Sequence, residues 1–88
     1  MERRSSPRYR VHKDGRFRLA DRSAGRSCRI KDLSATGARL DLLQDGALPD
    51  AGILEIASLD LGFPVRLRWR LGTECGVEFA GPPFPIPG

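Results

Sequence analysis

The 88-residue sequence has few of the residues from which reactive or metal centres are built. It contains one histidine, His12, and two cysteines, Cys28 and Cys75, which are 47 positions apart. No C-x-x-C pair is present, whereas a zinc site needs several Cys or His ligands at short spacing. We therefore expect no metal site, and we expect two buried free thiols rather than a disulfide.

Long apolar runs and a sustained helical period are also missing. No run approaches membrane-spanning length, and no apolar stretch follows the basic N-terminus as it would in a signal peptide. We therefore expect a cytoplasmic protein with no membrane partner.

The phosphate-binding G-x-x-x-x-G-K-[ST] and dinucleotide-binding G-x-G-x-x-G motifs do not occur, and the acids are scattered. These absences favour binding over catalysis, so we predict a protein that is not an enzyme and has no cofactor.

Positive charge is concentrated in the first third of the chain. Residues 1–31 contain 11 of the 15 basic residues and three of the 11 acidic residues, a net charge of +8, whereas residues 32–88 carry −4. This asymmetry favours an anionic partner. Thirteen of the basic residues are arginines, whose planar fork suits phosphate and the guanine O6/N7 edge. For any single arginine, a solvated side chain is the simpler interpretation.

Short alternating segments separated by turn residues predict an all-β fold. Apolar residues alternate with charged ones, or run together, in six segments: 9–19, 26–33, 38–43, 53–61, 65–71 and 75–79. Six short strands in one small domain indicate a barrel or a sandwich. We expect a turn at Gly62-Phe63-Pro64. Trp69 either stacks on a base of a ligand or lies in the core, and its phase with Val65 and Leu67 favours the core.

The strands divide the chain into three parts. Residues 1–9 are predicted to form a basic arm, residues 10–80 the barrel, and residues 81–88 a proline-rich tail. In an extended arm, Arg4 and Arg8 point to the same side about 13 Å apart, and Arg3 points to the other side. Four prolines exclude a helix in the tail, which is either a strap over the barrel or a loose end.

The segment Asp32-Leu33-Ser34-Ala35-Thr36-Gly37 joins two of the predicted strands. Asp and Ser side chains fold back onto nearby backbone amides. Gly37 permits a positive φ and lets other atoms approach its backbone closely. Taken alone, this segment predicts the corner of a β-hairpin.

Arg4-x-x-x-Arg8 followed by Asp32-x-Ser34-x-x-Gly37 resembles the two-part signature of the PilZ domain, a bacterial receptor module for cyclic di-GMP. Val65–Trp69 and Gly76-Val77-Glu78-Phe79 are similar to the late strands of that family, and the resemblance covers residues 3–79. It implies a six-stranded antiparallel β-barrel with the ligand on its outside, between the arm and the corner. Many family members carry a helix after the last strand, whereas this chain has the proline-rich tail.

The resemblance implies a set of ligand-binding residues: Arg3, Arg4, Arg8, Asp32, Ser34 and Gly37. The arginines suit the phosphates and guanines of cyclic di-GMP. Asp32 either accepts from the N1–H and N2–H of guanine or orients an arginine. The Ser34 hydroxyl either bonds the ligand or braces the corner, and Gly37 lets the ligand lie against the backbone.

These observations lead to one hypothesis and two alternatives. The hypothesis is a cyclic di-GMP receptor that signals when the ligand orders the arm and a partner protein, so far unknown, binds the new surface. The resemblance implies an output in motility or surface polysaccharide. The first alternative is a ligand-independent adaptor on the same fold. The second is a small nucleic-acid-binding β-barrel, but most aromatic residues are at core positions and leave few platforms for stacking bases.

Overall fold

The structure is a computed structural model, and it describes residues 8–18, 25–43 and 46–86. Arg3 and Arg4 lie outside these residues, and for Arg8 only the backbone is described. The regular elements are β1 (Arg8–Arg18), β2 (Arg26–Ser34), β3 (Gly37–Asp41), β4 (Ala51–Ile56), the 3₁₀ helix η1 (Ala57–Leu59), β5 (Leu61–Leu71), β6 (Glu74–Phe79) and β7 (Phe84–Pro85). Strand β1 thus begins at Arg8, so the end of the predicted arm is already part of the sheet.

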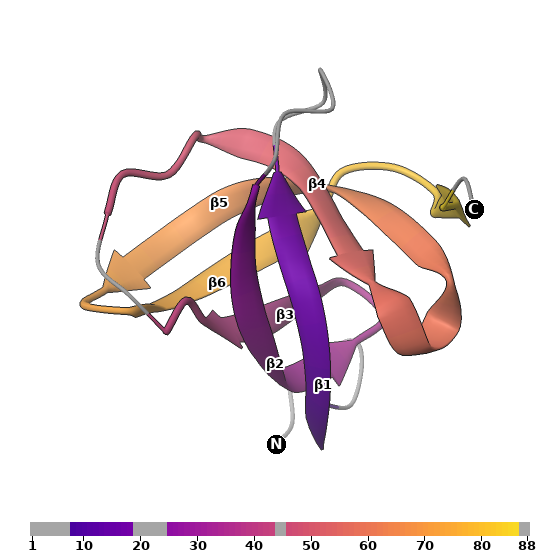
Figure 1. Cartoon of the computed structure of the whole chain (residues 1–88), viewed down its shortest axis with the longest axis horizontal. Helices are drawn as coiled ribbons and strands as arrows, with labels where there is room; N and C mark the ends of the chain where they lie inside the picture. The colour runs from indigo at the N-terminus through magenta and orange to yellow at the C-terminus, as the bar shows by residue number, and fades with distance from the viewer. Residues whose placement is uncertain (1–7, 19–24, 44–45, 87–88) are drawn as a thin grey trace, which may run out of the picture.

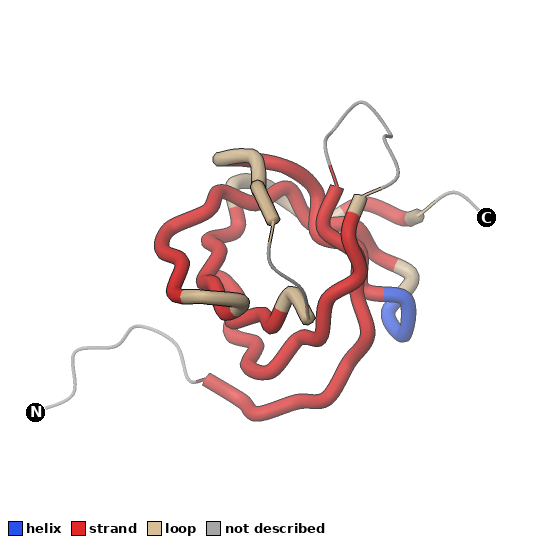
Figure 2. Tube along the Cα trace, turned by 60° about the vertical axis from the view of Figure 1, so that its left-hand side comes forward, coloured by secondary structure: helices blue, strands red, loops and turns tan. Residues whose placement is uncertain are grey.

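Six antiparallel strands close into a barrel. The order around it is β4-β1-β2-β3-β6-β5, and pairing of β5 with β4 completes the ring (Figures 1 and 2). Closure leaves a small barrel whose inward residues fill its interior, while outward residues alternate with them along each strand. The predicted all-β, six-stranded antiparallel barrel is confirmed. No helix among the described residues is long and apolar enough to cross a membrane.

The core is built from the inward-facing apolar residues of all six strands. They are Phe17, Cys28, Ile30, Leu40, Leu42, Leu54, Ile56, Val65, Cys75 and Val77. Both cysteines are free and buried, as predicted. Burial raises the pKa of the Cys28 thiol to about 12 and that of Cys75 to about 11, because a thiolate is poorly solvated there. Neither thiol is suited to act as a nucleophile.

The predicted strand 53–61 is confirmed over residues 53–56 but extends too far, and the predicted turn at 62–64 is wrong. Strand β4 ends at Ile56, η1 follows, and Asp60 makes the turn with a left-handed φ of 54°. Gly62 and Pro64 are paired inside β5, opposite Glu55 and Ile53. No sign of this turn appears in the sequence, because the apolar run continues through η1 and η1 contains neither Gly nor Pro. Gly62 is tolerated in the strand because the Phe84 ring covers it, and a Cβ there would be 2.7 Å from that ring.

A β-bulge at Arg68 changes which side chains of β5 face the core. Leu67 packs against the core, but the next paired residue is Trp69, opposite Gly76 on the outer wall. Trp69 is 45% exposed, so its predicted place in the core is wrong. One extra residue in a strand moves every later side chain to the other face.

The proline-rich tail is a strap rather than a loose end over its described part. Phe84 and Pro85 form β7, which pairs with the start of β5. Ile86 N donates to Asp60 O at 3.0 Å, and this bond extends the contact to the turn after η1. The described residues 80–86 contain no helix.

Candidate functional site

A row of directly paired residues crosses the outer wall of the barrel. Arg10 of β1 is opposite Asp32 of β2, which is opposite Arg39 of β3. Arg39 is in turn opposite Gly76 of β6, which is opposite Trp69 of β5. Five strands thus bring two arginines, a carboxylate and an indole to one surface. Directly opposite residues in an antiparallel pair share a face, so the register alone places them together.

Two bulges turn Asp32 and Trp69 into this row, and a third shift of register, in β1 between Arg10 and Lys13, lies beside Arg10. The first lies at Lys31, between the pairs Ile30–Leu40 and Asp32–Arg39. It lets Ile30 and Leu33 both face inward although they are three residues apart, and it turns Asp32 outward. The second is the bulge at Arg68 that turns Trp69 outward. Bulges re-aim side chains and are common beside binding sites.

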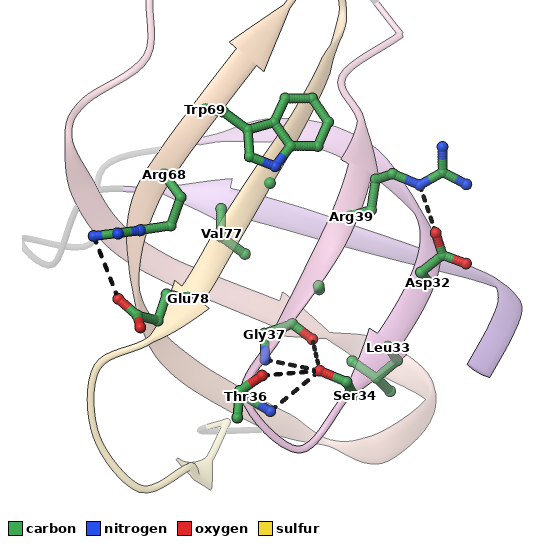
Figure 3. A pocket seen from close by; sticks show the side chains of 12 residues that line it. Asp32, Leu33, Ser34, Thr36, Gly37, Arg39, Arg68, Trp69, Val77 and Glu78 are labelled. Carbon is green, nitrogen blue, oxygen red and sulfur yellow. Dashed lines mark hydrogen bonds and ion pairs between the residues drawn. The ribbon is translucent and has the colours of Figure 1, made fainter. Parts of the chain in front are cut away.

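Asp32 and Arg39, neighbours within this row, form an ion pair. Asp32 is 6% exposed, and its Oδ2 accepts from Arg39 Nε at 2.5 Å. Arg39 Nη1 lies 3.5 Å from Glu74 Oε1, and Glu74 Oε2 accepts from Lys31 Nζ at 3.0 Å. Four charged side chains of alternating sign thus form one connected network (Figure 3 shows the Asp32–Arg39 contact). Of the two roles predicted for Asp32, orienting an arginine is the one that this geometry displays.

Ser34 braces the hairpin corner. Its Oγ accepts from the backbone N–H groups of Thr36 and Gly37, both at 3.2 Å, and lies 3.3 Å from Gly37 O. These contacts satisfy amides that the two-residue corner Ala35–Thr36 would leave unpaired. Of the two roles predicted for Ser34, bracing the corner is therefore present in the structure (Figure 3).

Gly37 is required for close packing and not for its backbone conformation. Its φ is not positive; the glycines with positive φ among the described residues are Gly25, Gly46 and Gly72. A Cβ on Gly37 would lie 2.2 Å from Val77 O of the neighbouring strand β6. Of the two properties that glycine offers at this corner, the structure uses the close backbone approach and not the positive φ.

A hollow of about 190 Å³ lies at the centre of this surface, and we call it the outer hollow. Its lining is Asp32, Leu33, Ser34, Thr36, Gly37, Ala38, Arg39, Arg68, Trp69, Gly76, Val77 and Glu78. Figure 3 shows the Trp69 indole on one side and Arg39 with Asp32 on the other, with the hairpin corner closing the end. Arg68 and Glu78 form an exposed ion pair at its rim, 3.7 Å apart.

The outer hollow brings together three of the residues predicted for the ligand site, Asp32, Ser34 and Gly37. The backbone of a fourth, Arg8, is paired with Ser34, so that residue begins its strand beside the corner. Arg3 and Arg4 lie outside the described residues.

The sequence alone did not identify Arg39 as a lining residue, and of the two places that it offered for Trp69 it favoured the core, which is wrong. Arg39 could have been found, because a hairpin with its corner at Ala35–Thr36 places Asp32 opposite Arg39 by counting. The exposed position of Trp69 could not have been found from the sequence, since no residue type marks the bulge at Arg68.

A closed β-barrel with a polar and aromatic hollow on its outer wall has the architecture of a small binding module. The chain belongs to the PilZ domain family: the family model matches residues 2–84, which include the whole lining of the outer hollow. PilZ domains are cyclic di-GMP receptor and adaptor modules, and they are not enzymes. A comparison with curated proteins found no match to this chain.

Proposed function

We propose that this protein is a non-enzymatic receptor for cyclic di-GMP, with its site at the outer hollow. The observation that carries the proposal is the convergence of Asp32, Ser34 and Gly37 on one hollow, beside the strand that begins at Arg8. These residues are far apart in sequence from Arg8, yet the register of β1 and β2 makes them neighbours. The family membership supports the same ligand.

The chemistry of the outer hollow suits a guanine nucleotide with two phosphates. The exposed face of Trp69 offers a stacking platform for a purine, and base–aromatic stacking contributes about 1–3 kcal/mol per base. Arg8, with Arg3 and Arg4 before it, supplies cations for the phosphates and for the O6/N7 edge of guanine. Arg10 is exposed and has no ion-pair partner among the described residues, so it adds to the same positive field.

The signalling step that we propose is ordering, by the ligand, of the part of the arm that precedes β1, because the predicted arm residues from Arg8 on are already paired with β2. The outer hollow is smaller than the roughly 300–1,000 Å³ of pockets that enclose a small ligand, so it offers contact on one side only. Arginines of the arm supply the remaining contacts when the ligand binds. The ordered arm and the ligand then form a surface for a partner protein. The output that we propose for this signal is control of motility or of surface polysaccharide. We propose that the protein acts in the cytoplasm.

Calorimetric titration of cyclic di-GMP at physiological salt tests the proposal. We expect micromolar or tighter binding to the wild-type chain. Arg8→Ala removes charge-assisted bonds of about 1.5–3 kcal/mol and should weaken binding roughly ten- to hundredfold. Arg16→Ala is the matched control, because Arg16 is an exposed arginine of the same strand that does not line the outer hollow. Absence of binding to the wild type would overturn the proposal and favour the ligand-independent adaptor.

Amide hydrogen exchange tests the ordering step separately. Residues 2–7 should gain protection when the site is saturated, while amides of the β5–β6 ladder keep the protection that they have without ligand. An unchanged arm in a saturated complex would reject the ordering step without affecting the binding proposal.

A salt titration separates the receptor from a nucleic-acid-binding barrel. A polynucleotide binder loses affinity steeply as salt rises, whereas a ligand with two phosphates shows a shallow slope.

A further inference from the structure

The first half of strand β1 is paired on one side only. Residues 15–18 pair with β2 on one side and with β4 on the other. Residues 8–14 pair with β2 alone among the described strands (Figure 1). Lys13 Nζ lies 3.3 Å from Ser58 Oγ of η1, so a side-chain contact crosses the gap at that end. We call residues 8–12 the open edge, because a strand paired on one side leaves backbone N–H and C=O groups free on the other.

One face of the open edge is continuous with an apolar end of the barrel. Tyr9 is directly opposite Leu33, so their side chains share a face. Leu33 packs against the core and lines a hollow of about 390 Å³ together with Phe63 and Phe79, whose stacked rings have centroids 4.8 Å apart. Tyr9 itself is 63% exposed. Every second side chain of a strand added to the open edge would lie on this apolar face.

The polar residues of the open edge are basic. They are Arg8, Arg10 and His12, and Lys13 follows them. Arg10 and His12 are exposed. Asp14 is the only acidic residue of β1, and it lies beyond the open edge. Such an edge attracts an acidic segment and repels a basic one.

A second copy of the chain is a poor occupant of the open edge. Antiparallel pairing of two open edges would bring Arg10 and His12 of one copy close to the same residues of the other, and like charges opposite one another are destabilising. A bulge also lies within the edge, since Val11 and His12 together oppose one residue of β2. Charges and bulges on edge strands discourage self-pairing. Residues 1–7 are basic as well, with two arginines and one acid, so the same repulsion applies to them.

We propose that the open edge is a docking site for an extended, acidic segment of a partner protein, which adds a strand to the barrel beside β1. The backbone of the segment pairs with β1, as in other cases of strand addition. Its apolar side chains share the face of Tyr9 and Leu33, and its acidic side chains lie beside Arg10 on the outer wall. The inference goes beyond the receptor function, because the residues of the open edge do not line the outer hollow.

Peptide titrations of the isotope-labelled full chain, followed by NMR without cyclic di-GMP, test the inference. The probe is a peptide of about six residues, a usual strand length, in which Glu and Val alternate. We expect the amide signals of residues 9–12 to shift on binding, while those of β6 keep their positions. A peptide in which Lys and Val alternate has the same pattern and the opposite charge. It should bind at least tenfold more weakly.

A chemically modified peptide separates strand addition from attraction between charges. The acidic peptide with a methyl group on every backbone nitrogen keeps its side chains and its charge but cannot donate hydrogen bonds to β1. It should bind at least tenfold more weakly than the unmodified peptide. Equal affinities for the two peptides would overturn the inference. This comparison needs no variant of the protein, so it holds even if a substitution prevents folding.

Two charge reversals in β1 locate the site. Arg10→Glu should weaken binding of the acidic peptide about fivefold or more, because an attraction becomes a repulsion. Arg16→Glu is the matched control: Arg16 is exposed on the same strand, but that strand is paired there on both sides, with Ser27 and Glu55. Each substitution places a new acid opposite an existing one, Asp32 or Glu55, so their effects on folding are comparable. Arg16→Glu should bind within about twofold of the wild type.

Three further results would overturn the inference. They are the absence of any shift with the acidic peptide, equal losses in Arg10→Glu and Arg16→Glu, and shifts of residues 9–12 that appear without peptide as the protein concentration rises. The last would assign the open edge to a second copy of the chain. A chain that binds the acidic peptide but not cyclic di-GMP would overturn the receptor function and support the docking site.

Discussion

The indole nitrogen of Trp69 lies against Gly76, so close that a Cβ on Gly76 would come within 2.1 Å of Nε1. The glycine thus lets the ring pack directly against strand β6 and form a wall of the outer hollow. Trp69 is the only tryptophan in the sequence, so its fluorescence reports on this surface alone.

Gly76→Ala should displace the indole. We expect a changed emission spectrum of the unliganded protein and at least a fivefold weaker affinity for cyclic di-GMP. The free energy of unfolding should change by less than about 1 kcal/mol, because an exposed side chain moves away more easily than backbone does. Gly81→Ala is the control, since its Cβ would meet its nearest neighbour, Pro64 Cγ, at 3.4 Å. An unaltered spectrum in Gly76→Ala would contradict the packing described above.

Trp69→Ala should weaken cyclic di-GMP binding about tenfold, through the loss of one stacking contact. Leu71→Ala provides the comparison: Leu71 lies further along the same strand and is 78% exposed, but it does not line the outer hollow. Calorimetry on both variants measures the difference. If the two variants bind cyclic di-GMP with equal affinity, Trp69 does not contribute to the binding site.

Gly37→Ala should destabilise the barrel by about 1–3 kcal/mol, which is the usual cost of overpacking. The added methyl meets the carbonyl of Val77 at 2.2 Å, and relief requires β3 and β6 to separate. Urea unfolding of Gly37→Ala beside Gly81→Ala measures the effect. A wild-type midpoint in Gly37→Ala would show that the two strands are further apart than the structure places them.

Ser34→Ala should lower the free energy of unfolding by about 1–2 kcal/mol, because two backbone amides at the corner lose their acceptor. Ser27→Ala is matched to it, since Ser27 is an exposed serine of the same strand and no hydrogen bond of its hydroxyl is present among the described residues. Hydrogen exchange should show the amides of Thr36 and Gly37 opening first. Unchanged protection at both amides would mean that the hydroxyl does not brace the corner.

Stability should fall as the pH rises above 9, because of the two buried thiols. In the unfolded chain a thiol titrates near its ordinary pKa of 9.0, whereas burial raises the native pKa of Cys28 to about 12 and of Cys75 to about 11. Below pH 9 the two thiols keep their protons in both the folded and the unfolded chain, so their burial contributes fully to the free energy of unfolding. Above it only the unfolded chain releases protons, which costs up to about 1.4 kcal/mol per pH unit for each thiol until the native pKa is reached.

Urea unfolding at pH 8, 9 and 10 measures this loss. The wild type should lose more free energy of unfolding between pH 9 and 10 than the Cys28→Ala/Cys75→Ala variant does. Parallel losses in the two proteins would mean that the thiols are solvated in the native state.

The sequence by itself determined the class of fold and most of the strands. Alternation over 9–19, 26–33, 38–43 and 65–71 matched β1, β2, β3 and the later part of β5, because a residue on a half-buried strand faces the core or the solvent in turn. The corner residues Ser34 and Gly37 were also recognisable, since serine and glycine are both typical of turns. The family signature pointed to the same corner.

Only the tertiary structure decided which side chains meet on the outer wall. The bulges at Lys31 and Arg68 reverse the alternation, and they leave no mark in composition because the extra residue can be of any type. They turn Asp32 towards Arg39 and take Trp69 out of the core that its alternation predicted. The need for glycine at position 37 likewise comes from β6, whose carbonyl at Val77 is 40 residues away in the chain. The local alternation of apolar and polar residues specifies the strands. The site depends instead on the register between strands, which is a property of the closed barrel.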